Sequence, residues 1–473
     1  MRRWWIWTAV PIALVALAET VQAQGPGDDE LSRIPSEAPP ALTATQSGPS
    51  RLGKLQKTVY LESATEAELL RSSFDVSPPS PAPTTIEQRL FVDAVLHWIP
   101  IRELSFHLSA RAGLRAGEDI AFPTHENIRV DFRELYASWK LFEGAYLDAG
   151  RINLKSGVAI GFNPTDFFKT RAVVEPLSVD PSVLREDRLG TLMLRGQFVW
   201  KHGSVGAAFA PRVASPPPLY TSTTLPALDP MFGRTNAHHR FLVKGNVDLF
   251  EDFSPEALFY EEDGAVRFGI NVAQSLGKKV VAYAEWAGGP QSGLSQEALS
   301  FGTLTKSFST AAAGNLATSS ATHFQQDASV GLSYANESKM TFWLEYHLHQ
   351  AGFSRADWGS WFEQGTGSHG QLLSPLLWFE RGYAQEQQVP MSKHSLFLRA
   401  DWTDAFIFNL ELTAFANVDL YDGSTLAQVT ASYAVTNLWT VSLLSAANLG
   451  SRRSEFGSLP SYFSALFAIR HYF

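Results

Sequence analysis

The chain has 473 residues, and its 38 Lys and Arg residues against 47 Asp and Glu residues give a formal net charge of −9. This balance excludes the strongly basic surface typical of nucleic-acid-binding proteins, so no nucleic-acid partner is expected. The sequence contains no cysteine, which excludes disulfides, Cys-ligated zinc and a thiol nucleophile.

Residues 1–23 have the three parts of a secretory signal peptide. Two arginines precede an apolar run over residues 4–18, and Val-Gln-Ala at 21–23 supplies a small-residue cleavage site. The apolar run is shorter than the roughly 20 residues that a spanning helix needs, which favours a signal peptide over a membrane anchor. No later stretch is apolar enough for a transmembrane helix. We therefore predict an exported protein that is cut after Ala23.

Residues 24–85 are rich in Pro, Ser and acidic residues, a composition that cannot bury enough apolar surface to fold alone. We interpret this segment as a flexible periplasmic leader. Two alternatives remain open, because the alternating stretch at 56–62 could form a first strand and the leader could plug a lumen. The folded domain is predicted to span residues 86–473.

From residue 88 onward, short runs of about ten residues alternate between apolar and polar side chains. In RFLVKGNVDLF, for example, Phe241 and Val243 share one face while Arg240 and Lys244 share the other. A period of two with one apolar face is typical of a half-buried strand, although a soluble sandwich has the same period. The predicted strands lie near 88–97, 101–112, 130–141, 144–153, 188–200, 203–211, 239–250, 255–260, 265–274, 279–287, 326–335, 339–349, 394–402, 405–418, 425–435, 439–449 and 461–473.

The connections between these strands separate a membrane barrel from a soluble sandwich. They mostly alternate between short turns, as at 143–144 and 201–203, and long loops at 113–129, 154–187, 212–238, 288–325 and 350–393. If the C-terminus is periplasmic, all five long loops fall on the outside, as in outer-membrane barrels. We predict an all-β, antiparallel, up-and-down transmembrane barrel of 16–18 strands. Seventeen strands are predicted, and bacterial barrels have an even number. Either 56–62 supplies an eighteenth strand, which we favour, or 88–97 does not span the membrane and the number is sixteen.

The last strand, SALFAIRHYF, alternates up to a terminal aromatic residue. Together with the signal peptide and the alternating strands, it resembles Gram-negative outer-membrane β-barrel proteins of the porin-like group. The resemblance implies that the barrel-assembly machinery recognises this strand and that outer-membrane lipid surrounds the barrel. The residues implied in recognition and lipid contact are Phe463, Phe467, Ile469 and Phe473. His471 and Ala468 depart from the usual pattern of such strands.

The loop at 154–187 and its flanks carry charges of both signs and an apolar segment at 158–162 that is unusual for a loop in water. We therefore expect the loop to fold into the barrel mouth. One hypothesis is a pore constriction in which arginines face carboxylates across an opening and set ion preference. Its candidate residues are Asp166, Lys169, Arg171, Arg185, Asp187 and Arg188. The alternative is a loop that only stiffens the wall by packing Phe162, Phe167 and Phe168.

No catalytic motif appears in a suitable context, so we predict neither an enzyme nor a cofactor. His347 and His349 share one strand face with Glu345, but without a third ligand in reach they are interpreted as wall residues rather than a metal site. Tryptophans near strand ends are placed as those of an interfacial belt would be, namely Trp98, Trp139, Trp200, Trp286, Trp402 and Trp439.

The sequence thus predicts an outer-membrane, porin-like channel for the passive diffusion of small hydrophilic solutes. One alternative is an export pore for a polysaccharide or other polymer. Another is a non-conducting surface scaffold or adhesin, in which Trp358, Trp361 and Trp378 of the 350–393 loop would contact a partner. The resemblance to porins also allows a homo-oligomer, although no interface stripe is evident in the sequence.

Overall fold

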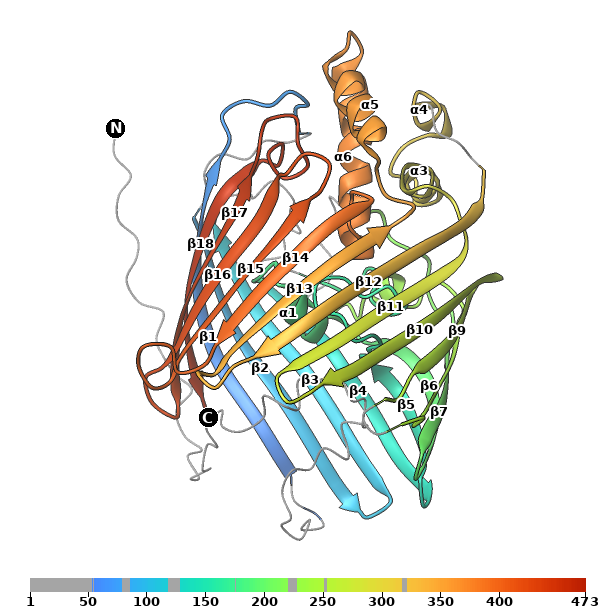
Figure 1. The fold of residues 1–473 in the computed structure, drawn as a ribbon, viewed down its shortest axis with the longest axis vertical. Coiled ribbons are helices and arrows are strands. Elements are labelled where there is room, and N and C mark those ends of the chain that lie inside the picture. The colour runs from blue at the N-terminus through green and yellow to red at the C-terminus, as the bar shows by residue number, and fades with distance from the viewer. Residues whose placement is uncertain are drawn as a thin grey trace.

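The computed structural model describes residue 53 and residues 55–78, 86–117, 128–174, 176–219, 228–250, 253–316 and 321–473. These residues form one antiparallel sheet of 18 strands that closes on itself, which confirms the predicted up-and-down barrel (Figure 1). The predicted signal peptide and most of the predicted leader lie outside the described residues.

Each strand pairs with its neighbours along the chain. The strands are β1 (Leu55–Leu70), β2 (Ile86–Ile101), β3 (Leu104–Gly117), β4 (Ile128–Phe142), β5 (Ala145–Ile152), β6 (Thr191–Trp200), β7 (Gly203–Ala210), β8 (Arg240–Val247), β9 (Glu256–Glu262), β10 (Ala265–Leu276), β11 (Val280–Gln291), β12 (His323–Ala335), β13 (Met340–His349), β14 (His394–Trp402), β15 (Leu410–Asp419), β16 (Thr425–Ala434), β17 (Trp439–Leu449) and β18 (Ser461–Tyr472).

The eighteenth strand is β1, which lies in the segment that the sequence analysis assigns to the leader. It pairs with β2 on one side and with β18 on the other, so that Tyr60 faces Tyr472 across the seam. The backbone N–H of Phe473 donates to the Val59 carbonyl at 2.9 Å, so the ladder continues to the last residue. The barrel therefore begins at Leu55 rather than at residue 86, and the alternative of a first strand is the one that the structure shows. Closure matters because an open edge in lipid would leave backbone groups unpaired.

The two ends of the barrel differ as the connections predict. The C-terminus and the short connections 102–103, 143–144 and 201–202 lie at one end, which we call the turn end. The long loops and most helices lie at the other, the loop end (Figure 1). Gly144 shows why such turns need glycine, because its φ is +79° and a Cβ there would lie 2.3 Å from the Val199 carbonyl oxygen.

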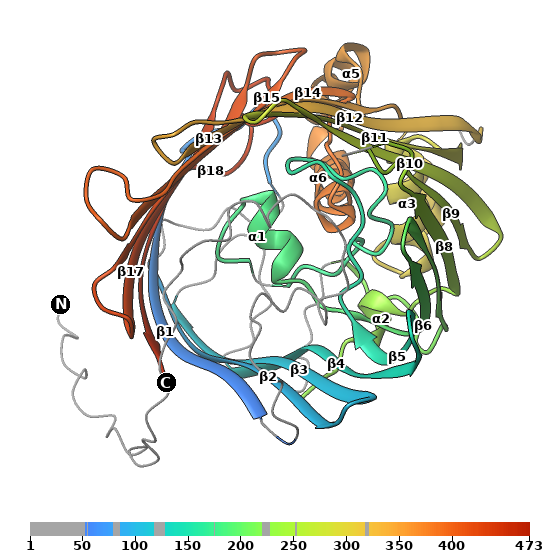
Figure 2. The ribbon, with the colours of Figure 1, turned by 60° about the horizontal axis from the view of Figure 1, so that its bottom comes forward.

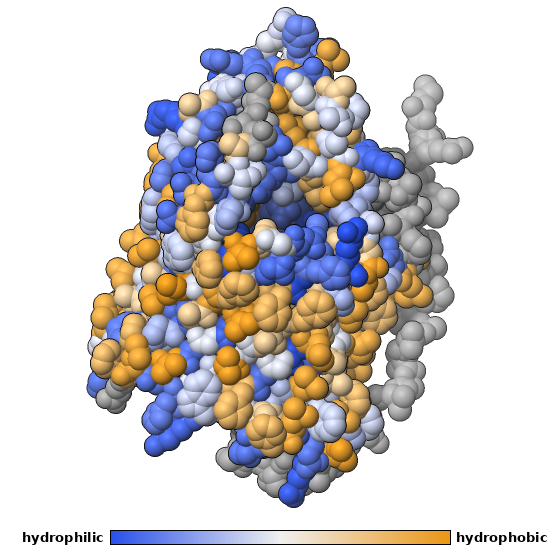
Figure 3. All heavy atoms as spheres, turned by 90° about the vertical axis from the view of Figure 1, so that its right-hand side faces the viewer, coloured by the Kyte–Doolittle hydropathy of each residue, from blue (hydrophilic) through white to orange (hydrophobic). Residues whose placement is uncertain are grey.

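The outer face of the strands is apolar and the inner face is largely polar. Exposed aliphatic and aromatic side chains alternate with half-buried charges, as where Leu194 points outward and Arg195 inward. On the face shown in Figure 3, apolar side chains gather over the strands and hydrophilic ones predominate toward the loop end. Phe467, Ile469 and Phe473, at the C-terminal end of the barrel, are exposed on its outer face. The exposed Trp98, Trp139, Trp200 and Trp439 all stand at strand ends next to the turn end, as expected of an interfacial belt.

Helices lie inside the barrel and above it. The short helices α1 (Pro181–Glu186) and α2 (Phe232–Thr235) lie within the ring of strands (Figure 2). At the loop end are α3 (Leu294–Leu304), α4 (Thr310–Ala313), α5 (Arg355–Thr366) and α6 (Gly370–Gln387). Among the described residues, no helix has both the length and the apolar character needed to cross a membrane.

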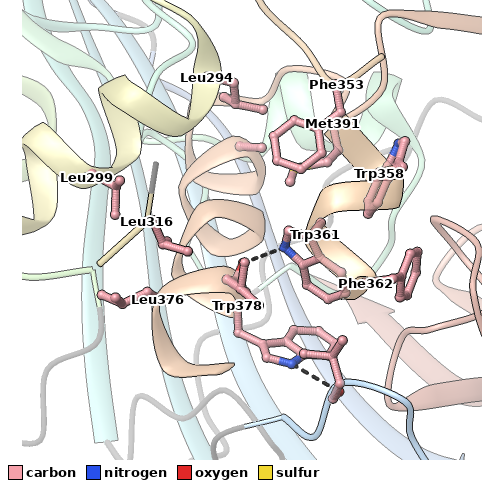
Figure 4. Close-up of a cluster of buried hydrophobic side chains, with 13 residues drawn as sticks. Leu294, Leu299, Leu316, Phe353, Trp358, Trp361, Phe362, Leu376, Trp378 and Met391 are labelled. Carbon is pink, nitrogen blue, oxygen red and sulfur yellow. Dashed lines mark hydrogen bonds between the residues drawn. The ribbon is translucent and has the colours of Figure 1, made fainter. Parts of the chain in front are cut away.

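We call α3, α5 and α6 the helical cap. Their facing sides form one apolar core, in which Trp358, Trp361 and Trp378 are almost completely buried (Figure 4). The interpretation of these tryptophans as contact residues on the surface is therefore wrong. Their spacing on α5 and α6 satisfies the packing of the cap instead.

Candidate functional site

The loop between β5 and β6, residues 153–190, lies within the lumen and is called the inward loop (Figure 2). Two wall carboxylates hold its apolar segment by its backbone. Glu345 on β13 accepts hydrogen bonds from the N–H groups of Ile160 and Gly161 at 2.7 and 2.8 Å. Glu285 on β11 accepts one from Ala159 N–H at 2.5 Å. These carboxylates are fully buried, so each replaces water as the partner of the loop backbone.

Aromatic packing fixes the same loop against the wall. Phe162, Phe167 and Phe168 are buried, and the Phe167 ring stacks on Tyr260 of β9 with centroids 4.5 Å apart. A Cβ at Gly161 would lie 2.5 Å from the Phe397 ring, so glycine is needed for this close approach. The packing that the sequence offered as the alternative to a constriction is thus present.

Three of the candidate constriction residues form a cluster of charged side chains within the inward loop. Arg188 binds Asp166 through two hydrogen bonds of 2.7 and 3.1 Å and also donates to the Leu154 carbonyl at 2.8 Å. The Nε of Arg185 lies 3.7 Å from the same carboxylate. Burial raises the pKa of Asp166, but the two guanidinium groups outweigh it and hold this pKa below its usual range. The structure therefore brings these residues together inside the loop rather than across an opening.

Lys169 and Arg171 make their hydrogen bonds to other groups. The Lys169 ammonium donates to the Asn163 carbonyl at 2.7 Å and lies 4.3 Å from the centre of the Phe162 ring. Burial lowers the pKa of Lys169 to about 8. The Arg171 guanidinium lies over Phe301 of the cap, and burial, followed by the nearby Arg234, lowers its pKa to about 10. In the described part of the chain, neither residue forms an ion pair with Asp166 or Asp187, although the constriction hypothesis expects charges to face each other across an opening.

Asp187 is the candidate residue that faces the wall. Its carboxylate accepts from Arg133 of β4 at 2.9 Å and from Arg111 of β3 at 3.3 Å, and its side chain is 32% exposed. Asp187 ends α1, and Asp180 begins it by capping the Ser182 N–H at 2.9 Å.

Asp180 also binds Arg399 of β14 through two contacts of 2.7 Å. The inward loop and α1 thus bridge the lumen from β14 to β3 and β4 (Figure 2). Asp187 lies where this bridge meets β3 and β4.

Five arginines on β2, β3 and β4 face this bridge, and we call them the arginine wall. They are Arg89, Arg111, Arg115, Arg129 and Arg133, and together with Asp131, Asp187, Val174, Leu177 and Leu189 they line a cavity of about 40 Å³. Each of the five has an acidic partner, and Asp93, for example, accepts from Arg111 at 2.9 Å and from Arg133 at 2.6 Å. Arg89 also donates to the Pro176 carbonyl of the inward loop at 3.2 Å.

The sequence analysis missed the arginine wall. The signal was available, because Arg111 and Arg115 are four residues apart, as are Arg129 and Arg133, and such spacing in a strand places side chains on one face. Sequence alone could not reveal that these faces, on neighbouring strands, meet Asp187.

His347 and His349 lie beneath the inward loop. His347 pairs with Glu345 at 2.8 Å and His349 with Asp327 at 2.8 Å, and both imidazoles contact the edge of Phe162. In the part of the chain that the structure describes, no group of three His, Asp or Glu side chains is arranged to hold a metal ion. Both imidazoles lie against the inward loop through Phe162.

Comparison with known proteins places the fold. No protein-family model matches the chain, and no curated protein matches it. Among solved structures, OpdQ of Pseudomonas aeruginosa is similar at 8% identity, with 89% of this chain and 99% of that chain covered and a TM-score of 0.50. OpdK of the same organism, solved with vanillate, is similar at 9% identity over the same shares of the two chains, with a TM-score of 0.50.

A porin of Rhodopseudomonas blastica, in a triple-mutant form, is also matched, at 10% identity over 89% of this chain and 100% of that chain, with a TM-score of 0.39. At these identities the likeness to OpdQ and OpdK establishes the fold alone. It confirms the resemblance to porin-like outer-membrane barrels at that level.

Proposed function

We propose that the protein is an outer-membrane channel through which small hydrophilic solutes diffuse passively. The loop end faces the outside of the cell and the turn end faces the periplasm. The support is a closed barrel of 18 strands, a size that leaves a lumen wider than wall side chains can fill, with an apolar outer face suited to lipid.

The observation that carries this proposal is the contact between Asp187 and the arginine wall. The inward loop is fixed by buried contacts, yet it presents Asp187 to Arg111 and Arg133 at a partly exposed position. Guanidinium groups bind carboxylate and phosphate oxygens in a planar, two-pronged geometry. A passage lined in this way sorts solutes by size and by the anionic groups that they carry.

Asp187 acts in this proposal as a resident counter-ion of the arginines. Its contacts with Arg111 are 3.3 Å long, whereas Arg111 binds Asp93 at 2.9 Å, so the Asp187 contact is the weaker of the two. A solute carboxylate enters by replacing Asp187 at these donors. Vanillate, the compound in the OpdK structure, is an example of a small solute with such a group.

Export and assembly follow the same proposal. Residues 1–23 direct export, and the outer-membrane lipid and the barrel-assembly machinery meet the last strand. The proposed assembly residues Phe463, Phe467, Ile469 and Phe473 belong to the strand that closes the barrel against β1 or follow it directly. Exposure of the last three on the outer face supports this assignment. A homo-oligomer would form through the same outer face.

Single-channel recording of the refolded protein in a planar bilayer under a salt gradient tests the proposal. We expect steady conductance, and we expect the reversal potential to shift toward cation preference when Arg111 and Arg133 are both replaced by Gln. Arg102→Gln, in a turn-end connection, is the matched control and leaves the potential unchanged. A barrel that inserts without conducting would contradict the channel and favour the surface-scaffold alternative.

A further inference from the structure

The helical cap packs as one body above the lumen. Trp358 and Trp361 of α5 meet Leu377 and Trp378 of α6, and α3 adds Leu299 to the same core (Figure 4). The indole N–H of Trp361 donates to the Leu377 carbonyl at 3.2 Å, which fixes α5 against α6. Close-packed interiors transmit displacement rather than absorbing it, so a shift of one helix moves the others.

Arg381 fastens the middle of α6 to the rim of the barrel. Its guanidinium is surrounded by the rings of Trp358, Trp361 and Trp378, at 5.2, 5.3 and 5.1 Å from their centroids. Its Nη1 donates to Ser458 Oγ at 2.7 Å, in the connection between β17 and β18. The cap therefore has a fixed attachment on one side of the lumen.

The C-terminal end of α6 rests on the inward loop. The Glu386 carbonyl accepts from the Arg171 N–H at 2.6 Å, and the Gln388 side chain donates to the Lys169 carbonyl. Arg234 of α2 joins the two segments, because its Nη2 binds the Glu386 carboxylate at 2.5 Å and its Nε donates to the Arg171 carbonyl at 3.0 Å. Arg171 has a left-handed backbone, with φ of +58°, so the inward loop bends sharply at this residue.

The contact continues from this bend to the constriction. The Ala172 carbonyl accepts from the Leu189 N–H at 2.7 Å, which ties the bend to the residue two positions after Asp187. Leu189 and Val174 line the same cavity as the arginine wall. An uninterrupted series of hydrogen bonds and backbone segments therefore joins α6 to the site where solutes are proposed to pass.

We propose that the helical cap is a gate whose position controls the constriction, with Arg234 and Glu386 as the connection between cap and inward loop. The proposal rests on the proposed channel function and adds regulation from the outside of the cell to it. When α6 shifts, the bend at Arg171 shifts with it, and the distance between Asp187 and the arginine wall changes. Arg234 is a positioning residue, because it contacts the loop and the cap rather than the passage.

Recordings of Arg234→Met and Glu386→Gln test the connection. We expect the frequency of channel closures to change by about five-fold or more, the range typical of coupled sites, while the fully open conductance stays that of the wild type. The controls are Arg453→Met, which removes an exposed ion pair with Asp75 at the same end, and Glu363→Gln on α5. Both controls should gate as the wild type does.

Hydrogen exchange distinguishes a coupling role of Arg234 from a purely structural one. Asp187→Asn should change amide exchange across residues 380–387 in the otherwise wild-type chain, but not in the Arg234→Met background. A conducting wild type whose closures and exchange are unaffected by Arg234→Met would overturn the gate and leave the channel intact. A silent wild type would overturn the proposed function, and the gate with it.

Discussion

Two carboxylates of the inward loop bind arginines at similar distances but in different surroundings. Asp166 binds Arg188 at 2.7 Å, with side chains 2% and 1% exposed, whereas Asp187 binds Arg133 at 2.9 Å with its own side chain 32% exposed. The buried pair holds the loop in shape, because breaking it would leave a charge in a dry environment. In the proposed function, Arg133 exchanges the partly exposed Asp187 carboxylate for that of a solute. Burial, rather than residue type or spacing, separates the structural role from the functional one.

Replacing Asp166 with Ala should give the largest effect of the changes considered. The Arg188 guanidinium would remain buried without its partner, which costs about 3–5 kcal/mol. We expect the inward loop to leave its position, with faster amide exchange over 153–190 and a larger conductance. Asp187→Ala is the matched control and should leave exchange over 158–168 unchanged. Equal loosening by both variants would show that the two pairs do not differ in role.

Replacing a wall carboxylate that binds the loop backbone should give a smaller effect. Glu345→Gln replaces one acceptor oxygen with an amide that donates, opposite the N–H groups of Ile160 and Gly161. An unsatisfied buried donor costs about 1–3 kcal/mol. We therefore expect faster exchange confined to residues 158–162, measured against Glu337→Gln, which removes an exposed ion pair at the turn end. Unchanged exchange would mean that aromatic packing alone holds the segment.

Alkaline pH should stabilise the folded inward loop, because it neutralises the buried Lys169 ammonium. Burial lowers the pKa of Lys169 to about 8 from the ordinary 10.5, so the folded loop bears the cost of a buried cation below pH 8 and loses that cost as the pH rises toward 10.5. Lys169→Met should therefore slow exchange of the loop at pH 7, by an amount worth at most about 3 kcal/mol. The difference from the wild type should shrink between pH 8 and pH 10, and a constant difference would contradict the role of protonation.

The same contrast explains what the sequence could predict. Strand positions, the two unlike ends and the closing strand follow from a period of two and from connection lengths, which are local properties. The strand β1 was ambiguous because its alternating stretch adjoins a Pro- and Ser-rich segment. The inward fold of the 154–187 loop was predictable from the apolar segment at 158–162, which needs a dry environment.

The roles of the loop charges were not predictable in this way. Asp166 and Asp187 are both acidic residues followed at short distance by basic ones, and only the three-dimensional structure shows which one is buried. The arginine wall depends on the register among β2, β3 and β4, including the irregularity between Ser109 and Ala110, which a single sequence does not encode visibly. Long-range pairing, such as Asp180 with Arg399, joins residues 219 positions apart and leaves no local pattern.

Asp187→Asn should have the smallest effect on stability and the most specific effect on binding. A partly exposed ion pair contributes within about 1 kcal/mol, so unfolding in denaturant should be nearly unchanged. The Asn amide does not compete with a solute carboxylate for Arg111 and Arg133 as the charged Asp187 does. A charge-assisted hydrogen bond contributes about 1.5 kcal/mol, which corresponds to about ten-fold in affinity.

We therefore expect a small monocarboxylate solute to block single-channel current at about ten-fold lower concentration in this variant, since 1.4 kcal/mol is a factor of ten. Asp401→Asn, on the inner face of β14, controls for a general loss of negative charge in the lumen. An equal gain in both variants would mean that overall potential governs the block. A gain specific to Asp187 means that this side chain occupies the place that the solute carboxylate takes. The exposed pair would then be the selective element, and the buried pair the support that keeps it in position.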